Sequence, residues 1–375
     1  MHVTFILQSS YNSGGMERML TTIANALASG YVVTVLTAFN EGRSDFFPFA
    51  DKVRRVDLGL TMSGNDYKTV RREYRAALTT WLMAHHQDVV VTLCSMEFFF
   101  LPDIKDGSRK IAWFHFAYNW FVETVDRFNS YWLKTVFGNL KRFEWLRVAR
   151  RYDRFIVLSE TDAKSWRRHL DNVSVIYNLV TIKPLAKPDY ASHRAISIGR
   201  IQRQKGFDFL VDAWKVVHKH CPDWQLDIFG GGSKENIQLL EDQIHHCGLE
   251  GVVNLCGYSS NVAAEYARHS LYIMSSRYEG FGLVLVEAGI CGLPLISYDC
   301  QQGPSEIIED GRNGYLVHPV GNVVGLADAI CALIADENKR RAMGEEAERM
   351  SKQFSMEHIS QDWRNMFDRL LRDRG

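Results

Sequence analysis

The chain has 375 residues, of which 46% are hydrophobic and 23% charged, and its formal net charge at neutral pH is zero. This length exceeds one typical domain core and predicts two α/β domains, while the high hydrophobic content excludes a disordered chain. A net charge of zero gives no indication of nucleic-acid binding for the chain as a whole.

The seven cysteines are widely spaced, and no pair has the spacing of a zinc site or a redox motif. This usage is typical of reduced cysteines in a cytosolic protein. We expect no signal peptide and no transmembrane segment, because the chain enters a strand at once and no apolar run approaches the ~18 residues needed to span a bilayer.

The first predicted strand, residues 2–8, is followed by Gly14 and Gly15 and then by a helix over residues 16–28. Glycines between a strand and a helix let backbone N–H groups face a phosphate, although a tight turn alone would also explain them. The segment lacks the Gly-x-Gly-x-x-Gly pattern of dinucleotide-binding proteins, which argues against an NAD enzyme.

A histidine closes a later strand of the same domain. Strands are predicted over residues 32–38, 54–58, 88–94 and 110–116, and His115 lies at the end of the last one. Ligands bind at the carboxyl ends of strands in open α/β sheets, so His115 can hydrogen-bond a sugar hydroxyl. A structural histidine packed among aromatic residues is the alternative.

Residues 119–152 combine basic and aromatic side chains, partly at helical spacing. A basic helix with exposed aromatic residues can lie on an anionic membrane surface, and a lipid-linked acceptor would then be expected. The alternative is that the aromatic residues are core and the basic residues a solvated face. The basic residues are Lys134, Lys141, Arg142, Arg147, Arg150 and Arg151.

A linker over residues 181–190 separates the two predicted domains. The second domain opens with a strand over residues 195–198, followed by Arg200 and Lys205. Two cations at this spacing could donate charged hydrogen bonds to a diphosphate, although loop cations are usually only solvated. A later strand, residues 252–256, ends shortly before Tyr258.

The most informative stretch is a strand, a turn and a helix start. The strand is predicted over residues 271–276, and Gly282 and Leu283 lie where the helix begins. A glycine turn and a helix N-terminus together suit a phosphate. Glu279 before the helix and Glu287 within it would flank that phosphate, as suits a nucleotide sugar, although both could be solvated surface acids.

The context Glu-Gly-Phe-Gly-Leu…Val-Glu-Ala at residues 279–288 resembles the signature of the retaining family 4 glycosyltransferases, which have the GT-B fold. Three further segments resemble family motifs in the same order: 14–18, 199–206 and 303–308. The segment 175–179 departs from the family pattern, since Tyr177 and Leu179 replace a proline and a glycine.

The resemblance implies a role for each candidate residue. Contact with the donor diphosphate is implied for Gly14, Gly15, Arg200, Lys205, Gly282 and Leu283. Contact with the donor sugar is implied for Glu279 and His115, with the ribose for Glu287, and with the base for the backbone at Tyr258.

The implied architecture is two Rossmann-like α/β domains facing across a cleft. Residues 1–182 would form the acceptor-binding domain, residues 183–355 the nucleotide-sugar domain, and residues 356–375 a helix that crosses back onto the first domain. No Asp-x-Asp pair occurs, so neither a metal nor another cofactor is expected.

The implied activity is retaining transfer of a hexose or an N-acetylhexosamine, with UDP the favoured carrier. The acceptor would be a glycan or a lipid-linked molecule in bacterial polysaccharide or lipopolysaccharide synthesis. The enzyme would be cytoplasmic, with residues 119–152 as its contact if it is peripheral on the inner face of the cell membrane. The alternatives are a nucleotide-sugar epimerase of the same fold and an inactive glycosyltransferase-like binding subunit.

Overall fold

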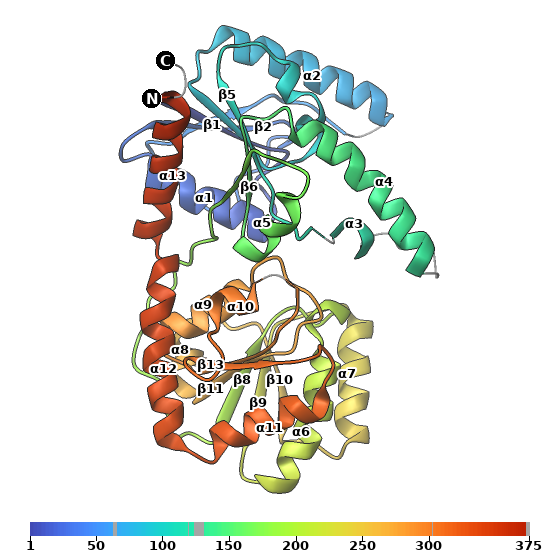
Figure 1. Cartoon of the computed structure of the whole chain (residues 1–375), viewed down its shortest axis with the longest axis vertical. Coiled ribbons are helices and arrows are strands. Elements are labelled where there is room, and N and C mark those ends of the chain that lie inside the picture. The colour runs from blue at the N-terminus through green and yellow to red at the C-terminus, as the bar shows by residue number, and fades with distance from the viewer. Residues whose placement is uncertain (63–65, 119, 124–130, 302, 373–375) are drawn as a thin grey trace. The chain divides into compact units, whose positions relative to one another are not determined.

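The computed structural model describes residues 1–62, 66–118, 120–123, 131–301 and 303–372. The chain forms two compact units (Figure 1). One comprises residues 1–179 and 356–375, and the other residues 180–355. The sequence placed the change of domain at residues 182/183 and 355/356.

The first unit is built on a parallel sheet of seven strands in the order β3-β2-β1-β4-β5-β6-β7. The strands are short and largely apolar, as expected when helices cover both faces of a parallel sheet. They are β1 (His2–Leu7), β2 (Val32–Thr37), β3 (Arg54–Asp57), β4 (Val89–Thr92), β5 (Arg109–Trp113), β6 (Arg154–Val157) and β7 (Val173–Val175).

Six described α-helices belong to the first unit, and one of them comes from the far end of the chain. That helix, α13, places Trp363 against Phe5 and Trp113 in the core, with ring centroids 5.9 and 4.9 Å apart. The helices are α1 (Gly15–Leu27), α2 (Tyr67–Ala84), α3 (Trp120–Glu123), α4 (Tyr131–Ala149), α5 (Glu160–Trp166) and α13 (Met356–Arg372).

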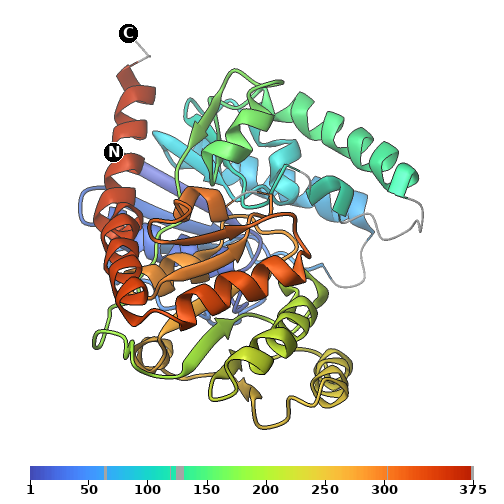
Figure 2. The same cartoon turned by 60° about the horizontal axis from the view of Figure 1, so that its bottom comes forward.

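The second unit repeats the same plan with a parallel sheet of six strands in the order β10-β9-β8-β11-β12-β13. Its core joins the sheet to α6 and α11, which lie side by side in Figures 1 and 2. The strands are β8 (Arg194–Ile198), β9 (Gln225–Phe229), β10 (Val253–Gly257), β11 (Leu271–Met274), β12 (Leu295–Tyr298) and β13 (Gly314–Val317).

The seven described α-helices of the second unit follow its strands in alternation and end in a pair. They are α6 (Phe207–His220), α7 (Lys234–His246), α8 (Val262–Arg268), α9 (Leu283–Ile290), α10 (Pro304–Ile307), α11 (Val323–Ile334) and α12 (Glu337–Ser351). The prediction of two parallel α/β units with a C-terminal helix returning to the first is confirmed. Within the described residues, no helix has the length and apolar character needed to cross a membrane.

Candidate active site

In each sheet the strand order reverses at one point, between β1 and β4 in the first unit and between β8 and β11 in the second. The loops that leave the carboxyl ends of these strands turn to opposite sides. Open α/β sheets bind ligands in the crevice that this reversal creates. In the second unit, Arg200 and Lys205 follow β8 and Glu279 follows β11, so these predicted residues lie at the reversal.

Lys205 and Glu279 form an ion pair across this reversal. The Nζ atom of Lys205 lies 2.7 Å from Oε1 of Glu279, and the hydroxyl of Ser276 donates to the same oxygen at 2.6 Å. The two side chains are only 17% and 9% exposed. The stem of Lys205 passes Gly199, where an added Cβ would lie 3.2 Å from its methylenes. The pair therefore holds a cation and an anion in fixed positions, largely screened from water.

Gly206 holds the two loops of this pair together. Its φ is +61°, and an added Cβ would lie 2.1 Å from the carbonyl oxygen of Ser275. The hydroxyl of Ser275 in turn donates to the carbonyl of Lys205 at 3.0 Å. Only glycine combines this backbone conformation with this closeness, so the loop after β8 is fixed against the loop after β11.

Two predicted residues near the pair have exposed side chains. Arg200 makes no hydrogen bond or ion pair with the residues that the structure describes. Tyr258 follows β10 and is 83% exposed. Its ring lies so close to Gly231 that a Cβ there would meet the ring atoms at about 2.5 Å. A guanidinium and an aromatic ring are thus presented to solvent on the loops that follow β8 and β10.

Helix α9 begins in this region with its first amides uncapped by a side chain. Gly282 precedes it with φ +92°, and Leu283 is its first residue. Free N–H groups and the positive end of the helix dipole favour an anion here. Glu287 is buried within the same helix. Gly303, whose added Cβ would lie 2.0 Å from the carbonyl oxygen of Phe281, brings the predicted 303–308 loop against this turn.

In the first unit, Gly14 and Gly15 lie where β1 gives way to α1, at the reversal of that sheet. Gly14 is extended, and an added Cβ would lie 2.2 Å from the carboxylate of Glu17. No described atom lies within 4 Å of a Cβ built at Gly15, the first residue of α1. The backbone at Gly15 is therefore open to a ligand.

His115 lies just beyond β5, with its ring centroid 4.3 Å from that of Trp113. Its Nε2 atom is buried and has no hydrogen-bond partner among the described residues. Burial lowers the pKa of His115 to about 3, so the imidazole is neutral at physiological pH. His115 thus packs among aromatic residues, as the structural alternative predicts. Its ring nitrogen without a partner favours the other alternative, a hydrogen bond to a ligand.

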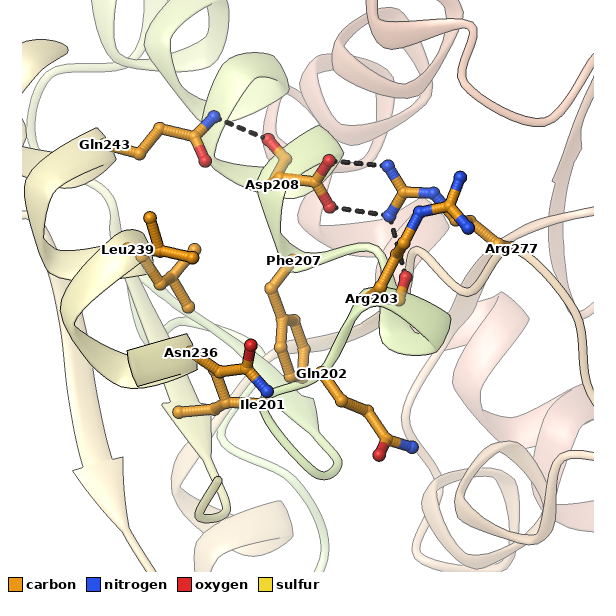
Figure 3. Close-up of a pocket in the computed structure, with 10 residues that line it drawn as sticks. Ile201, Gln202, Arg203, Phe207, Asp208, Asn236, Leu239, Gln243 and Arg277 are labelled. Atoms are coloured by element: carbon orange, nitrogen blue, oxygen red, sulfur yellow. Dashed lines mark hydrogen bonds and ion pairs between the residues drawn. The ribbon is translucent and has the colours of Figure 1, made fainter. Parts of the chain in front are cut away.

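Sequence reasoning missed the ion pair that anchors the loop after β11. The guanidinium of Arg277 donates two hydrogen bonds to the carboxylate of Asp208, at 2.7 and 2.6 Å (Figure 3). It also donates to the carbonyl of Arg203 and lies over the ring of Phe209. Burial raises the pKa of Asp208, but the hydrogen bonds and the charge of Arg277, together with backbone hydrogen bonds, lower it on balance. A cation directly after a buried strand was the available signal.

The same residues border a cavity of about 260 Å³ on the second unit (Figure 3). Its walls come from the loop after β8, the start of α6, and α7. None of the described residues that line it was predicted as a site residue from the sequence. The lining residues are Ile201, Gln202, Arg203, Phe207, Asp208, Asn236, Leu239, Leu240, Gln243 and Arg277.

Two sequence profiles together cover nearly the whole chain. The profile described as Glycosyltransferase Family 4 matches residues 13–183, and the one described as Glycosyl transferases group 1 matches residues 188–350. The chain belongs to glycosyltransferase family 4. The predicted family is thereby confirmed, and with it the prediction that the protein is a glycosyltransferase enzyme.

Curated relatives of this family 4 enzyme differ in how much of their length it spans. An uncharacterized glycosyltransferase of Haemophilus influenzae is 26% identical over 97% of this chain and 99% of its own. A poly(glycerol-phosphate) α-glucosyltransferase of Bacillus subtilis is 33% identical over 46% of this chain but 25% of its own. The amylovoran biosynthesis glycosyltransferase AmsD of Erwinia amylovora is 36% identical over 47% of this chain and 48% of its own length. The chain thus matches less than half of the last two.

Solved structures show the fold. The chain superposes on a sucrose-phosphate synthase from Thermosynechococcus elongatus with a TM-score of 0.80 and 19% identity, over 99% of both chains. Anabaena HepE, solved in complex with UDP, gives a TM-score of 0.75 and 19% identity, over 98% of this chain and 100% of its own. Together with the family, these likenesses confirm that the two parallel α/β units form the GT-B fold.

Proposed function

We propose that this family 4 enzyme is a retaining glycosyltransferase that moves a hexose or an N-acetylhexosamine from a UDP-sugar to a glycan or lipid-linked acceptor, without a metal ion. The observation that carries the proposal is the Lys205–Glu279 pair across the strand reversal of the second sheet. It places a cation and a hydrogen-bond acceptor beside the uncapped start of α9. A donor with a diphosphate and a hydroxyl-rich sugar offers the groups that these residues can bind.

The choice of donor is supported by relatives. HepE, which shares the fold, was solved with UDP, and the Bacillus relative is named an α-glucosyltransferase. Relatives named for poly(glycerol-phosphate) and amylovoran support a role in bacterial surface-polysaccharide synthesis. All seven cysteines are free thiols, which suits an enzyme at work in the cytoplasm or on the inner face of the cell membrane.

The leaving diphosphate is the main charge that the enzyme has to stabilise during transfer. In the proposal, Lys205 and Arg200 face the diphosphate from the second domain, together with the backbone amides at Gly282 and Leu283. For Gly14 and Gly15 of the first unit, contact with the diphosphate is what the family resemblance implies. Lys205 is held in place by Glu279 and the amides by the backbone, so these groups stabilise charge with little reorganisation during the reaction and without a metal.

The sugar and the nucleoside have their own contacts in the proposal. Glu279 positions hydroxyls of the donor sugar, and the neutral imidazole of His115 exchanges a hydrogen bond with one of them rather than acting as an acid. Glu287 binds the ribose, and the backbone at Tyr258 meets the base. As the family resemblance implies, the donor phosphate itself takes the proton of the acceptor hydroxyl on the face from which it leaves.

Metal independence is the part of the proposal that is simplest to test separately. Among the described residues, no group of three or more histidine, cysteine, aspartate or glutamate side chains could hold a metal ion. We expect the donor to bind equally well with magnesium and with a chelator, as the lack of an Asp-x-Asp pair in the sequence predicts.

The test is a thermal-shift panel of UDP- and GDP-sugars, with and without magnesium. A ligand at a hundredfold excess over its Kd stabilises the protein by ~2.7 kcal/mol, so a true donor should raise the Tm clearly. We expect one UDP-sugar to do so regardless of magnesium, and to release UDP only when an acceptor is present. Release of UDP without any acceptor would instead indicate the epimerase. No shift with any member of the panel would contradict the proposed donor.

A further inference from the structure

Helix α4 (Tyr131–Ala149) carries apolar residues on two opposite sides. One side faces its own unit, where Trp145 stacks on Phe98 with ring centroids 4.3 Å apart and where Leu146 and Ala149 are buried. Gly138 lets α3 approach closely, since an added Cβ would lie 2.8 Å from the carbonyl oxygen of Phe121. This inner side accounts for how the helix packs on its unit.

The outer side of α4 carries large apolar side chains that are exposed. Trp132, Leu140 and Phe143 are 69%, 61% and 64% exposed, and Val136 and Phe137 are exposed as well. Positions 132, 136, 140 and 143 recur at helical spacing, so they form one stripe. We call these five side chains the outer face of α4. Large apolar side chains exposed together on one surface mark a contact site.

Figures 1 and 2 show α4 standing out from the sheet of its unit, with its N-terminal end farthest away. The outer face occupies this projecting part of the helix. Such a position suits insertion into a surface that is larger than the protein.

The stripe changes from apolar to basic toward the C-terminal end of the helix. Arg147 continues it with an exposed side chain, and Lys141 is exposed at its edge. Arg150 and Arg151 follow, and residues 131–151 hold six basic residues and one acidic residue in a chain whose net charge is zero. This segment thus has a local excess of positive charge beside exposed aromatic residues.

A second group of basic residues joins this basic end. Asp103 forms ion pairs with Arg151 and, at 3.5 Å, with Arg75 of α2. Lys68 and Arg72 lie on α2 before Arg75 and are exposed. The positive region therefore extends from α4 onto α2 and is broader than one helix.

We propose that the outer face of α4 inserts into the interfacial region of an anionic lipid bilayer, with the basic residues of α4 and α2 against the lipid headgroups. Aromatic and aliphatic side chains next to several cations are the combination that binds such a surface. The basic region would gain no favourable electrostatic contact from a neutral protein partner, whereas anionic lipid headgroups complement its charge. We therefore favour lipid. The inference rests on the proposed function in one respect, because a docked enzyme would meet a lipid-linked acceptor.

The experiment is co-sedimentation of the whole protein with vesicles, in the absence of donor and acceptor. Vesicles of phosphatidylcholine and phosphatidylglycerol in equal parts are compared with phosphatidylcholine alone. We expect binding to the mixed vesicles only, and release by added salt. The double variant Lys141→Gln/Arg147→Gln should bind about 30-fold more weakly, since each cation near an anionic surface contributes ~1 kcal/mol.

The apolar contribution is tested with Trp132→Ser/Phe143→Ser, which should abolish binding at an unchanged Tm. Met83→Ser is the matched control, because Met83 is equally exposed on α2 of the same unit, and it should bind as the unaltered protein does. Binding of the Trp132→Ser/Phe143→Ser variant at normal strength would overturn the proposal. So would a dimer that this variant converts to a monomer, since the outer face would then bind a second copy. Donor-induced thermal shifts, measured without vesicles, report on the proposed function separately.

Discussion

Replacing Glu279 by glutamine should separate the two roles proposed for the Lys205–Glu279 pair. The amide keeps the shape and one oxygen that can accept from Lys205 and Ser276, but it removes the negative charge. An exposed ion pair contributes at most about 1 kcal/mol, and breaking a fully buried pair costs about 3–5 kcal/mol. With side chains 17% and 9% exposed, this pair lies between those limits, and we expect a loss of about 2 kcal/mol.

Such a loss would lower the Tm of the unliganded protein by about 4–8 °C, as expected for a unit of this size. UDP should restore much of the loss, because its diphosphate replaces the missing charge beside Lys205. Transfer should fall by a factor of about 100 or more, since the sugar would be less well oriented. The assay compares Tm with and without UDP and then kcat. An unchanged Tm and normal kcat would refute the reasoning, and Glu337→Gln, which removes the charge from an exposed ion pair with Arg341 on α12, serves as a control.

Three further changes test other parts of the site and its support. Glu287→Ala should weaken UDP binding about tenfold, measured by calorimetry, because one hydrogen bond to a charged group contributes about 1.5 kcal/mol; equal affinity would remove Glu287 from the ribose contact. Gly206→Ala should lower the free energy of unfolding in urea by more than about 2 kcal/mol, since its Cβ would meet the carbonyl of Ser275; a smaller change would mean that the two loops can separate. Burial raises the pKa of Asp227, but hydrogen bonds led by the one from His269 lower it to about 2. Ionised Asp227 should therefore add about 2 kcal/mol to the free energy of unfolding above pH 4, and this contribution should be lost as the pH falls from about 4 to 2. A urea midpoint equally acid-sensitive in Asp227→Asn would contradict this.

The local parts of the site could be predicted from sequence because each depends on neighbouring residues. An apolar run, then glycine, then a helical pattern predicted the turn at Gly282, and the structure has α9 beginning directly after it. The contact between Lys205 and Glu279 joins residues 74 positions apart. It depends on β8 and β11 being neighbours in the sheet, and local sequence patterns do not predict strand order.

Two details show where pattern reasoning stopped. The strand predicted to reach Ser276 ends at Met274, and the hydroxyls of Ser275 and Ser276 beyond it donate to the carbonyl of Lys205 and to Glu279. The described aromatic residues of 119–152 divide between buried side chains, such as Phe121, and exposed ones, such as Phe143, and membrane contact stays a prediction. Of the basic residues named in that segment, Lys134 has a side chain outside the described set.

The chain crosses between its two units twice, and the crossings lie next to each other. The backbone N–H of Val180 donates to the carbonyl of Phe354 at 3.3 Å, and Val180 pairs with Ser355 as a parallel bridge. The second unit is therefore an insertion whose two ends are already joined by hydrogen bonds, and the first unit is the host. Ends this close can be linked with little loss of entropy. Residues 180–355 could thus be removed by joining 179 to 356, or expressed alone, which would turn one enzyme into two separate proteins.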